Sequence, residues 1–141
     1  MQIDKFSDYA LRVLMVLAVN HPERVSVRHI ADSFSISENH VAKIATALVR
    51  EGYVISQRGR SGGLSLAIAP GEASIGAVLR AIKGTPPVAE CFGDASACRI
   101  MPACGLRGPL KEAQEAFFSV LDRYTLADIT MHRQLLSQLL G

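Results

Sequence analysis

The chain has 141 residues, 49% of them hydrophobic and 20% charged, which is enough to bury a core and unlike the composition of a disordered protein. No apolar run is long enough to span a membrane and the first residues do not have the pattern of a secretion signal, so no membrane partner is expected. The formal net charge is only +2, but residues 1–70 carry eight Lys and Arg against six Asp and Glu, so contacts with a polyanion are expected in this half.

The first 70 residues have the pattern of a winged helix-turn-helix domain. Ser7 is expected to cap a helix in which apolar residues recur at helical spacing, and Gly52 is expected to end the third helix. A turn of sequence RGRSGG separates two short alternating segments, which are predicted to pair as a hairpin. The expected elements are helices over 8–20, 27–34 and 38–52 and strands over 53–57 and 64–68. The fold class is therefore predicted to be mainly α with a small β-hairpin.

Residues 71–141 are predicted to carry a linker helix, a loop and a dimerisation helix. A helix is expected over 74–83, and the Gly- and Pro-containing stretch 91–104 is expected to be a loop. A helix expected from about 109 to 127 has apolar residues at alternating steps of three and four, the pattern of a coiled-coil seam: Leu110, Ala113, Phe117, Val120, Tyr124 and Ala127. So broad an apolar stripe, far along the chain from the N-terminal core, predicts a homodimer with twofold symmetry.

Two groups of side chains are candidates for contact with double-stranded DNA. A recognition helix reads bases with its first two turns, and the exposed candidates there are Ser37, Glu38, Asn39, His40 and Lys43. In the wing, Arg58 and Arg60 flank a glycine at the hairpin tip and are suited to phosphates or to a minor groove. The alternatives are a solvated helix face, a protein-binding module of the same shape, and a solvated turn.

Three cysteines, Cys91, Cys98 and Cys104, stand close together in the sequence. An odd number confined to one segment argues against a secreted disulfide framework and for a reducing cytoplasm. Thiolates on such a loop can converge on one soft metal centre. Structural zinc prefers closer cysteine pairs, and iron-sulfur clusters take four ligands where the sequence supplies three. Redox-silent cysteines and a thiol oxidation sensor are open alternatives.

The sequence contains no arrangement typical of an enzyme. It has neither a Ser/His/Asp or Cys/His catalytic signature nor a phosphate-binding glycine motif. Of its four histidines, only His40 stands at a position that suggests a functional role. No catalytic activity is therefore predicted.

Four stretches together resemble the Rrf-type winged-helix regulators of transcription. They are FSDYALRVLMVLA at the start, RGRSGGLSLA in the wing, ECFGDASACRIMPACGL in the loop, and FFSVLDRYTLADI near the end. Within this family, Asp8 and the stretches CRIMPACGL and YTLADI are most similar to the nitric-oxide-sensing repressors. Arg107 stands where another branch of the family has a histidine soon after the third cysteine, which argues against that branch.

The resemblance implies a homodimeric repressor of operator DNA with an iron-sulfur cluster on Cys91, Cys98 and Cys104, with 4Fe-4S favoured over 2Fe-2S. Asp8 of the partner subunit would be the fourth ligand, although a carboxylate at a helix start also stabilises the helix dipole without any metal. Nitric oxide would be the effector, and nitrosylation or cluster loss would release the operator. An iron-responsive repressor and a cluster-free thiol redox regulator are the alternatives.

Overall fold

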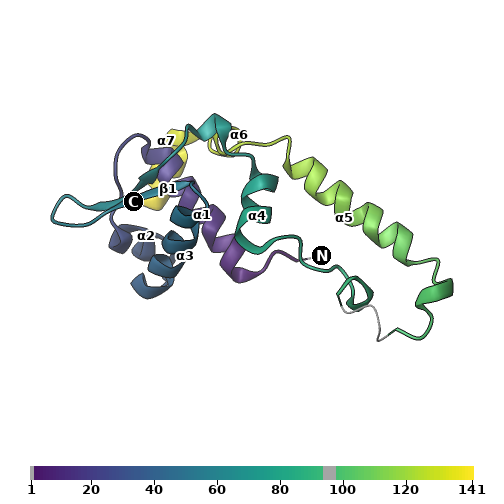
Figure 1. Ribbon diagram of the computed structural model, residues 1–141. Coiled ribbons are helices and arrows are strands. Elements are labelled where there is room, and N and C mark those ends of the chain that lie inside the picture. The colour runs from purple at the N-terminus through teal and green to yellow at the C-terminus, as the bar shows by residue number, and fades with distance from the viewer. Residues whose placement is uncertain (1, 94–97) are drawn as a thin grey trace.

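The computed structural model describes residues 2–93 and 98–141. In Figure 1 the first three helices, the hairpin and the last helix form the main body, and the long helix α5 extends away from it. The elements in chain order are α1 (Lys5–Asn20), α2 (Val27–Phe34), α3 (Glu38–Arg50), β1 (Val54–Gln57), β2 (Gly63–Leu66), the 3-10 turn η1 (Pro70–Glu72), α4 (Ile75–Lys83), the 3-10 turns η2 (Glu90–Phe92) and η4 (Met101–Ala103), α5 (Arg107–Leu121), α6 (Leu126–Ile129) and α7 (Arg133–Leu140). The predicted fold class, mainly α with one hairpin, is confirmed.

Helix α1 begins three residues before its predicted start. The carboxylate of Asp4 accepts hydrogen bonds from the backbone N–H groups of Phe6 and Ser7, at 3.0 and 3.1 Å. The buried Ser7 hydroxyl donates to the same carboxylate at 2.7 Å. The prediction that Ser7 is the N-cap is therefore wrong, because the Asp4 carboxylate already satisfies the free N–H groups of the first turn. Asp8 is consequently the fourth helical residue and not the first.

Helices α2 and α3 begin where the sequence predicts. The Oγ of Ser26 accepts from the N–H of His29, and the Oγ of Ser37 accepts from the N–H of His40, each at 3.1 Å. Between these helices Ser35 adopts the left-handed conformation, with a φ of 54°. Apolar side chains on the inner faces of α1, α2 and α3 are buried against one another: Leu14, Leu17, Ile30, Val41, Ile44 and Leu48. This packing fixes the recognition helix α3 on α1.

The wing is an antiparallel hairpin whose base is anchored to the entry of α2. Strands β1 and β2 pair over four residues each, slightly less than predicted. A bridge between Val25 and Leu64 holds a third chain segment against them. Gly63 has a φ of 149°, and a Cβ there would lie 2.6 Å from the Val25 carbonyl oxygen, so this close approach requires glycine. The tip of the wing, residues 58–62, extends outward from this fixed base.

Helix α5 ends after Leu121, whereas the sequence predicted a helix to about residue 127. Tyr124 and Ala127, the last two positions of the predicted seam, therefore do not lie on α5. The other four positions do lie on it: Leu110, Ala113, Phe117 and Val120. The helix that was predicted to carry the seam is therefore confirmed from Leu110 to Val120 and is wrong beyond Leu121.

Polar contacts account for the early end of α5. The Arg80 guanidinium on α4 donates two hydrogen bonds, of 2.6 and 2.7 Å, to the Asp122 carboxylate just after α5. Three residues later Thr125 starts α6 with a reciprocal capping box, in which its side chain and that of Asp128 each accept from the other's backbone N–H. Periodicity in apolar residues carries no signal for such caps, which turn the chain back toward α4.

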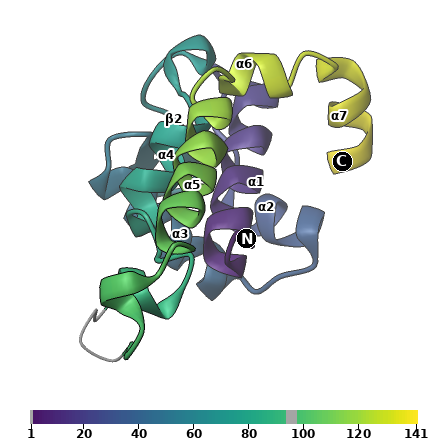
Figure 2. The same ribbon diagram turned by 90° about the vertical axis from the view of Figure 1, so that its right-hand side faces the viewer.

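The C-terminal residues form a separate helix, α7, which contacts α1. The Arg133 guanidinium donates to the carbonyl oxygens of Val19 and His21, the latter at 2.8 Å. On α2 the Ser33 hydroxyl lies 2.8 Å from the Leu140 carbonyl oxygen. Figure 2 shows α6 leading across the end of α1 from α5 to α7. Helix α7 therefore braces the helix-turn-helix and does not extend the long helix.

One hydrophobic core joins the N-terminal elements to those that follow. Side chains from α4, α5 and α6 belong to the same buried cluster as those of α1 to α3, among them Val78, Leu79, Phe118 and Leu126. Helices α4 and α5 are therefore packed in the same core as the body that holds α3. In residues 2–93 and 98–141 no helix combines the length and the apolar character that a bilayer crossing requires.

The caps around α6 predict how stability depends on pH. The hydrogen bonds from Arg80 lower the pKa of Asp122, and the backbone N–H of Thr125 lowers the pKa of Asp128. A carboxyl whose folded pKa lies below its unfolded value stabilises the fold above that value, about 3.9, and this contribution is lost as the pH falls further. We expect the melting temperature to fall below about pH 4 and to fall less steeply in Asp122→Asn. Thermal unfolding at stepped pH checks this, with the exposed Glu112→Gln as the control for charge; equal pH profiles for Asp122→Asn and wild type would contradict it.

Candidate functional site

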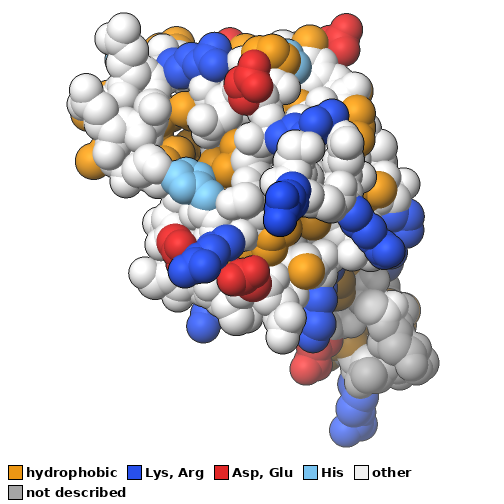
Figure 3. Space-filling model, turned by 90° about the vertical axis from the view of Figure 1, so that its left-hand side faces the viewer, with side chains coloured by type: hydrophobic (Ala, Val, Ile, Leu, Met, Phe, Trp, Pro, Cys, Tyr) orange, Lys and Arg blue, Asp and Glu red, His pale blue; other side chains and the backbone are white. Residues whose placement is uncertain are grey.

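The first turns of α3 present a polar, solvent-exposed surface. Glu38, Asn39 and Lys43 are exposed, and Ser37 is exposed while its hydroxyl also caps the helix. The structure therefore places four of the five predicted recognition residues where a DNA groove could reach them. Figure 3 views this end of the molecule and shows Lys and Arg side chains spread over the face, with acidic side chains among them.

His40, the fifth predicted recognition residue, is packed against α1. Its ring centre lies 6.5 Å from that of Phe6 with the planes nearly parallel, and 5.5 Å from that of Tyr9 in an edge-on arrangement. Its Nε2 atom is buried and has no hydrogen-bond partner among the described residues. Sequence reasoning missed Phe6 and Tyr9, although their three-residue spacing puts both on one side of α1.

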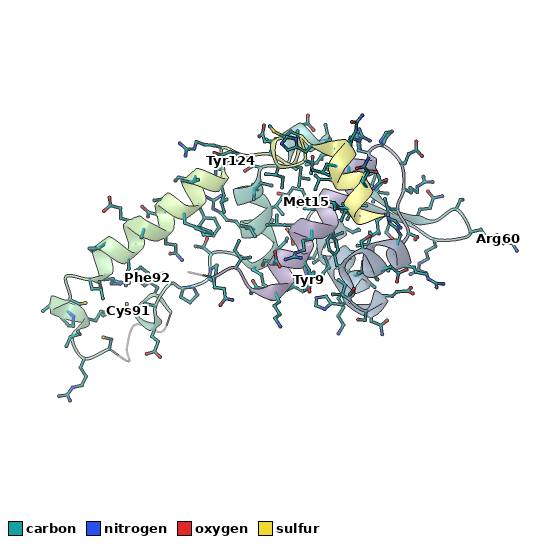
Figure 4. All side chains as sticks on the ribbon, turned by 180° about the vertical axis from the view of Figure 1, so that it is seen from behind. Tyr9, Met15, Arg60, Cys91, Phe92 and Tyr124 are labelled. Carbon is teal, nitrogen blue, oxygen red and sulfur yellow. The ribbon has the colours of Figure 1, made fainter. Side chains whose placement is uncertain are left out.

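The two wing arginines lie at the tip of the hairpin, beyond the last strand pair. Arg58 and Arg60 are both exposed, and Figure 4 shows Arg60 at one extreme end of the molecule. The Gly62 N–H donates to the Gly59 carbonyl at 2.9 Å, and a Cβ on Gly62 would lie within 3 Å of backbone atoms. The turn is therefore tight, and it places two exposed arginines at the tip of the wing.

The three cysteines lie near the far end of α5. Cys91 is in η2, Cys98 precedes η4, and Cys104 follows it; all three are free and partly buried. Residues 91–93 and 98–104 form short 3-10 turns and connections, in agreement with the predicted loop, and the rest of that stretch lies outside the described residues. Figure 4 places Cys91 at the opposite end of the molecule from Arg60.

A contact between Phe92 and Arg107 holds the two ends of the cysteine segment together. The guanidinium carbon of Arg107, in the first turn of α5, lies 5.5 Å from the centre of the Phe92 ring. Phe92 follows Cys91 directly, and Arg107 comes three residues after Cys104. This cation–π contact therefore closes the segment between its first and last cysteine. In the sequence, Arg107 stands out only as a departure from a histidine.

Asp8 does not lie with the cysteines of its own chain. Its carboxylate is 3.0 Å from the Arg12 guanidinium, and both side chains are nearly half exposed. The guanidinium carbon of Arg12 is in turn 5.3 Å from the centre of the Tyr9 ring. Across the described residues, no group of three or more His, Cys, Asp or Glu side chains is placed to hold a metal ion. One chain alone therefore does not assemble the predicted ligand set.

The kinds of donor nevertheless suit an iron-sulfur centre. Three free thiols lie on one short segment, and thiolate is the usual protein ligand of such centres. The segment also precedes the N-terminus of α5, where no side chain caps the free N–H groups. That positive helix end favours an anionic centre nearby. A fourth donor has to come from elsewhere, and Asp8 is exposed enough to serve a second chain.

The outer face of α5 is apolar and open to solvent. Leu106, Val120 and Tyr124 are each more than 40% exposed along or beside it, and Ala113 is exposed between them. Phe117 differs from these residues because it packs partly against the core. Contiguous exposed apolar surface is the kind of surface through which proteins associate.

Comparisons with known proteins are consistent across sequence and structure. Residues 3–132 match the Rrf2 family, described as iron-dependent transcriptional regulators. The chain is 45% identical over 142 residues to the HTH-type transcriptional regulator NsrR of Geobacillus kaustophilus, covering 99% of this chain and 97% of that protein. It is 40% identical over 131 residues to the HTH-type transcriptional repressor NsrR of Streptomyces coelicolor, covering 92% and 88%. Among solved structures, CymR, the global cysteine regulator of B. subtilis, aligns with a TM-score of 0.75 at 24% identity, over 94% of this chain and 98% of that one.

Proposed function

Because the chain belongs to the Rrf2 family of transcriptional regulators, we propose that it is a homodimeric repressor that binds operator DNA and senses nitric oxide through an iron-sulfur centre. The observation that carries this proposal is the set of three free thiols on one segment of a chain that resembles NsrR regulators over nearly its whole length. The operator is bound in the loaded state, and it is released when the centre reacts with nitric oxide or is lost.

The DNA contacts divide between α3 and the wing. Ser37, Glu38, Asn39 and Lys43 form the recognition surface, with Asn39 and Lys43 best placed to reach base edges because both are exposed on the first two turns. His40, the fifth residue predicted there, packs against α1 behind this surface. Arg58 and Arg60 contact phosphates or enter the minor groove. The strongly exposed wing supports this assignment, since its base is fixed and its tip is free of the body.

The metal ligands come from two chains. Cys91, Cys98 and Cys104 supply three thiolates, and Asp8 of the partner subunit supplies a carboxylate, the harder and weaker ligand for iron. When bound, a 4Fe-4S cluster supplies iron atoms that nitric oxide can attack. Phe92 and Arg107 hold the ends of the cysteine segment together. The carboxylate of Asp8 would be the ligand that exchanges most easily.

The dimer brings two recognition helices to a fixed separation. The apolar stripe on α5, from Leu106 to Val120, packs against its copy across a twofold axis. Two half-sites on one face of the duplex lie about 34 Å apart. A shift of the cysteine segment against the start of α5 changes this separation, because α5, α4 and the helix-turn-helix share one core. Small rotations are therefore sufficient to release DNA.

Anaerobically purified protein tests the proposal directly. Visible absorbance and operator affinity are measured before and after stoichiometric nitric oxide, and again after iron chelation without nitric oxide. We expect a coloured protein whose operator affinity falls when nitric oxide is added. The family is described as iron-dependent regulators, which favours a second candidate, an iron-responsive repressor. Release of the operator on iron chelation, with no response to nitric oxide, would support this second candidate. A colourless protein that responds to thiol oxidants would select the redox alternative.

Removing a wing arginine should weaken binding to any duplex. Arg58→Ala or Arg60→Ala should each reduce affinity by about tenfold and lower the salt slope by about 0.9 for each phosphate that the protein no longer neutralises. Fluorescence anisotropy at several salt concentrations measures both quantities, with Lys111→Ala on the exposed face of α5 as the control. Unchanged affinity and salt slope in both wing variants would show that the wing arginines do not contact DNA.

Asp8→Ala should retain three thiolate ligands and still assemble a centre, with an altered visible spectrum and a changed rate of reaction with nitric oxide. In the metal-free protein the same change should cost no more than about 0.5 kcal/mol, because the pair with Arg12 is exposed. Asp32→Ala, which breaks the exposed pair with Arg28 on α2, is the matched control. Identical spectra and reaction rates for wild type and Asp8→Ala would reject the ligand assignment.

A further inference from the structure

We propose that His40 couples α1 to the recognition helix, and that it acts through the packing of its ring and not by reading a base. The inference rests on the proposed function, in which Asp8 changes its ligation when the sensor reacts. In this inference, a change in the partner of the Asp8 carboxylate alters the position of α3 through contacts of Arg12, Tyr9 and His40.

An unbroken set of contacts leads from Asp8 to His40. The Asp8 carboxylate holds the Arg12 guanidinium at 3.0 Å, and this guanidinium lies over the Tyr9 ring, 5.3 Å from its centre. The Tyr9 ring meets the His40 ring edge-on at 5.5 Å. Each step joins adjacent groups, so a change in the partner of Asp8 alters the position of Arg12 and, through Tyr9, that of His40.

His40 is placed where such a change acts on DNA binding. It lies in the first turn of α3, and its backbone N–H is the one that the Ser37 hydroxyl caps. A second aromatic ring, that of Phe6, lies nearly parallel to the His40 ring at 6.5 Å between centres. The ring therefore sits between the start of α1 and the start of α3. Moving it turns the segment that carries Glu38 and Asn39, the exposed residues beside it.

The Nε2 atom of His40 is not available to a base in this conformation. A side chain that reads a base needs a polar atom exposed in the groove, but His40 Nε2 is buried and without a partner in the described part of the chain. A buried polar atom left unpaired costs about 1–3 kcal/mol. The packing of the His40 ring must therefore offset the free-energy cost of leaving its Nε2 atom without a hydrogen bond.

Two substitutions distinguish packing from hydrogen bonding at this position. His40→Phe retains an aromatic ring between Phe6 and Tyr9, whereas His40→Ala removes it. His29→Ala, which removes a half-buried imidazole from α2, is the matched control. For each protein the operator affinity is measured in the cluster-loaded and the metal-free form, and the ratio of the two affinities is the coupling.

We expect His40→Ala to reduce this ratio at least tenfold, and His40→Phe and His29→Ala to keep it within about twofold of wild type. A ratio preserved in His40→Ala would overturn the inference. So would a loss of preference at one base pair in His40→Phe, because that result would make His40 a base reader. A wild-type ratio of one would instead refute the proposed function, and the inference with it.

A measurement on the metal-free protein tests the contacts without the cluster. Amide hydrogen exchange is followed in the first turn of α3, in wild type and in Asp8→Asn. Cutting the pair with Arg12 should change exchange there severalfold when His40 is present and should have no effect in the His40→Ala background. Equal responses in both backgrounds would show that α1 and α3 are not coupled through this ring.

Discussion

Aspartate in place of Val120 is expected to convert the dimer into folded monomers. Val120 is 44% exposed on the outer face of α5 and does not belong to the core of its own chain. Burying an unpaired charge in an apolar interface costs about 3–5 kcal/mol, and twofold symmetry introduces the charge twice. Sedimentation velocity should show a monomer, while circular dichroism should keep the helical signal of wild type.

Ser119→Asp provides the control for the Val120 experiment, because it adds the same charge at an exposed neighbouring position outside the apolar stripe. Phe117 is a poorer choice for the test, since it packs partly against the core and meets Phe118 edge-on at 5.4 Å. A charge at Phe117 would therefore disturb folding and assembly together. If the Val120→Asp protein remains a dimer, the interface does not lie on the outer face of α5.

Replacing any one of the three cysteines by alanine is expected to give a colourless protein with no response to nitric oxide. Each thiol is one of only three in the chain, so no neighbouring cysteine can substitute for the missing ligand. Because the thiolate would bind iron directly, we expect iron content to fall by at least about 100-fold, beyond the 10- to 100-fold typical of changes in groups that only hydrogen-bond to a ligand. Iron and sulfide analysis with visible spectroscopy measures the effect.

The cysteine variants should retain the dimer, since the stripe on α5 contains no metal ligand. Phe92→Leu is an informative companion, because it keeps all three thiols and removes only the ring over which Arg107 lies. It should assemble a centre that is lost faster to a chelator. A full cluster spectrum in any one Cys→Ala variant would show that the residue is not a ligand.

The helix-turn-helix was predictable because its signals are local. Helices α2 and α3 begin at the predicted residues, and the buried positions of α3, Val41, Ile44 and Leu48, follow from helical spacing. The start of α1 was misplaced because Asp4 and Ser7 are both good caps, and only the structure shows that the serine is buried and bonds to the aspartate. Competition between two plausible caps cannot be resolved from spacing.

The end of α5 and the surroundings of His40 were not predictable, for a different reason. Asp122 receives its partner, Arg80, from a position 42 residues earlier, and His40 packs against rings about 30 residues away. Contacts between such distant residues leave no periodic trace in the sequence. The place of His40 in the first turn of α3 predicts exposure, whereas the aromatic side chains on α1 decide the orientation of its ring.

The prediction that the chain is not an enzyme is confirmed by its family and by its relatives, which are transcriptional regulators. Cysteine-rich segments occur in both catalytic and regulatory proteins, so the thiols alone did not decide this point. The match of residues 3–132 to a family of transcriptional regulators decides it.

In the proposed nitric oxide sensor, the contact between Phe92 and Arg107 has a consequence for reloading of the iron-sulfur centre. Closing a flexible loop of fifteen residues costs about 2 kcal/mol in entropy, and here the closure exists in the protein chain without metal. An incoming cluster would then meet a segment whose two ends are already in contact, and it would have to supply less of that free energy. Under the proposed function, we expect the same protein molecule to be reloaded after nitric oxide has been removed, so that repression resumes without new synthesis.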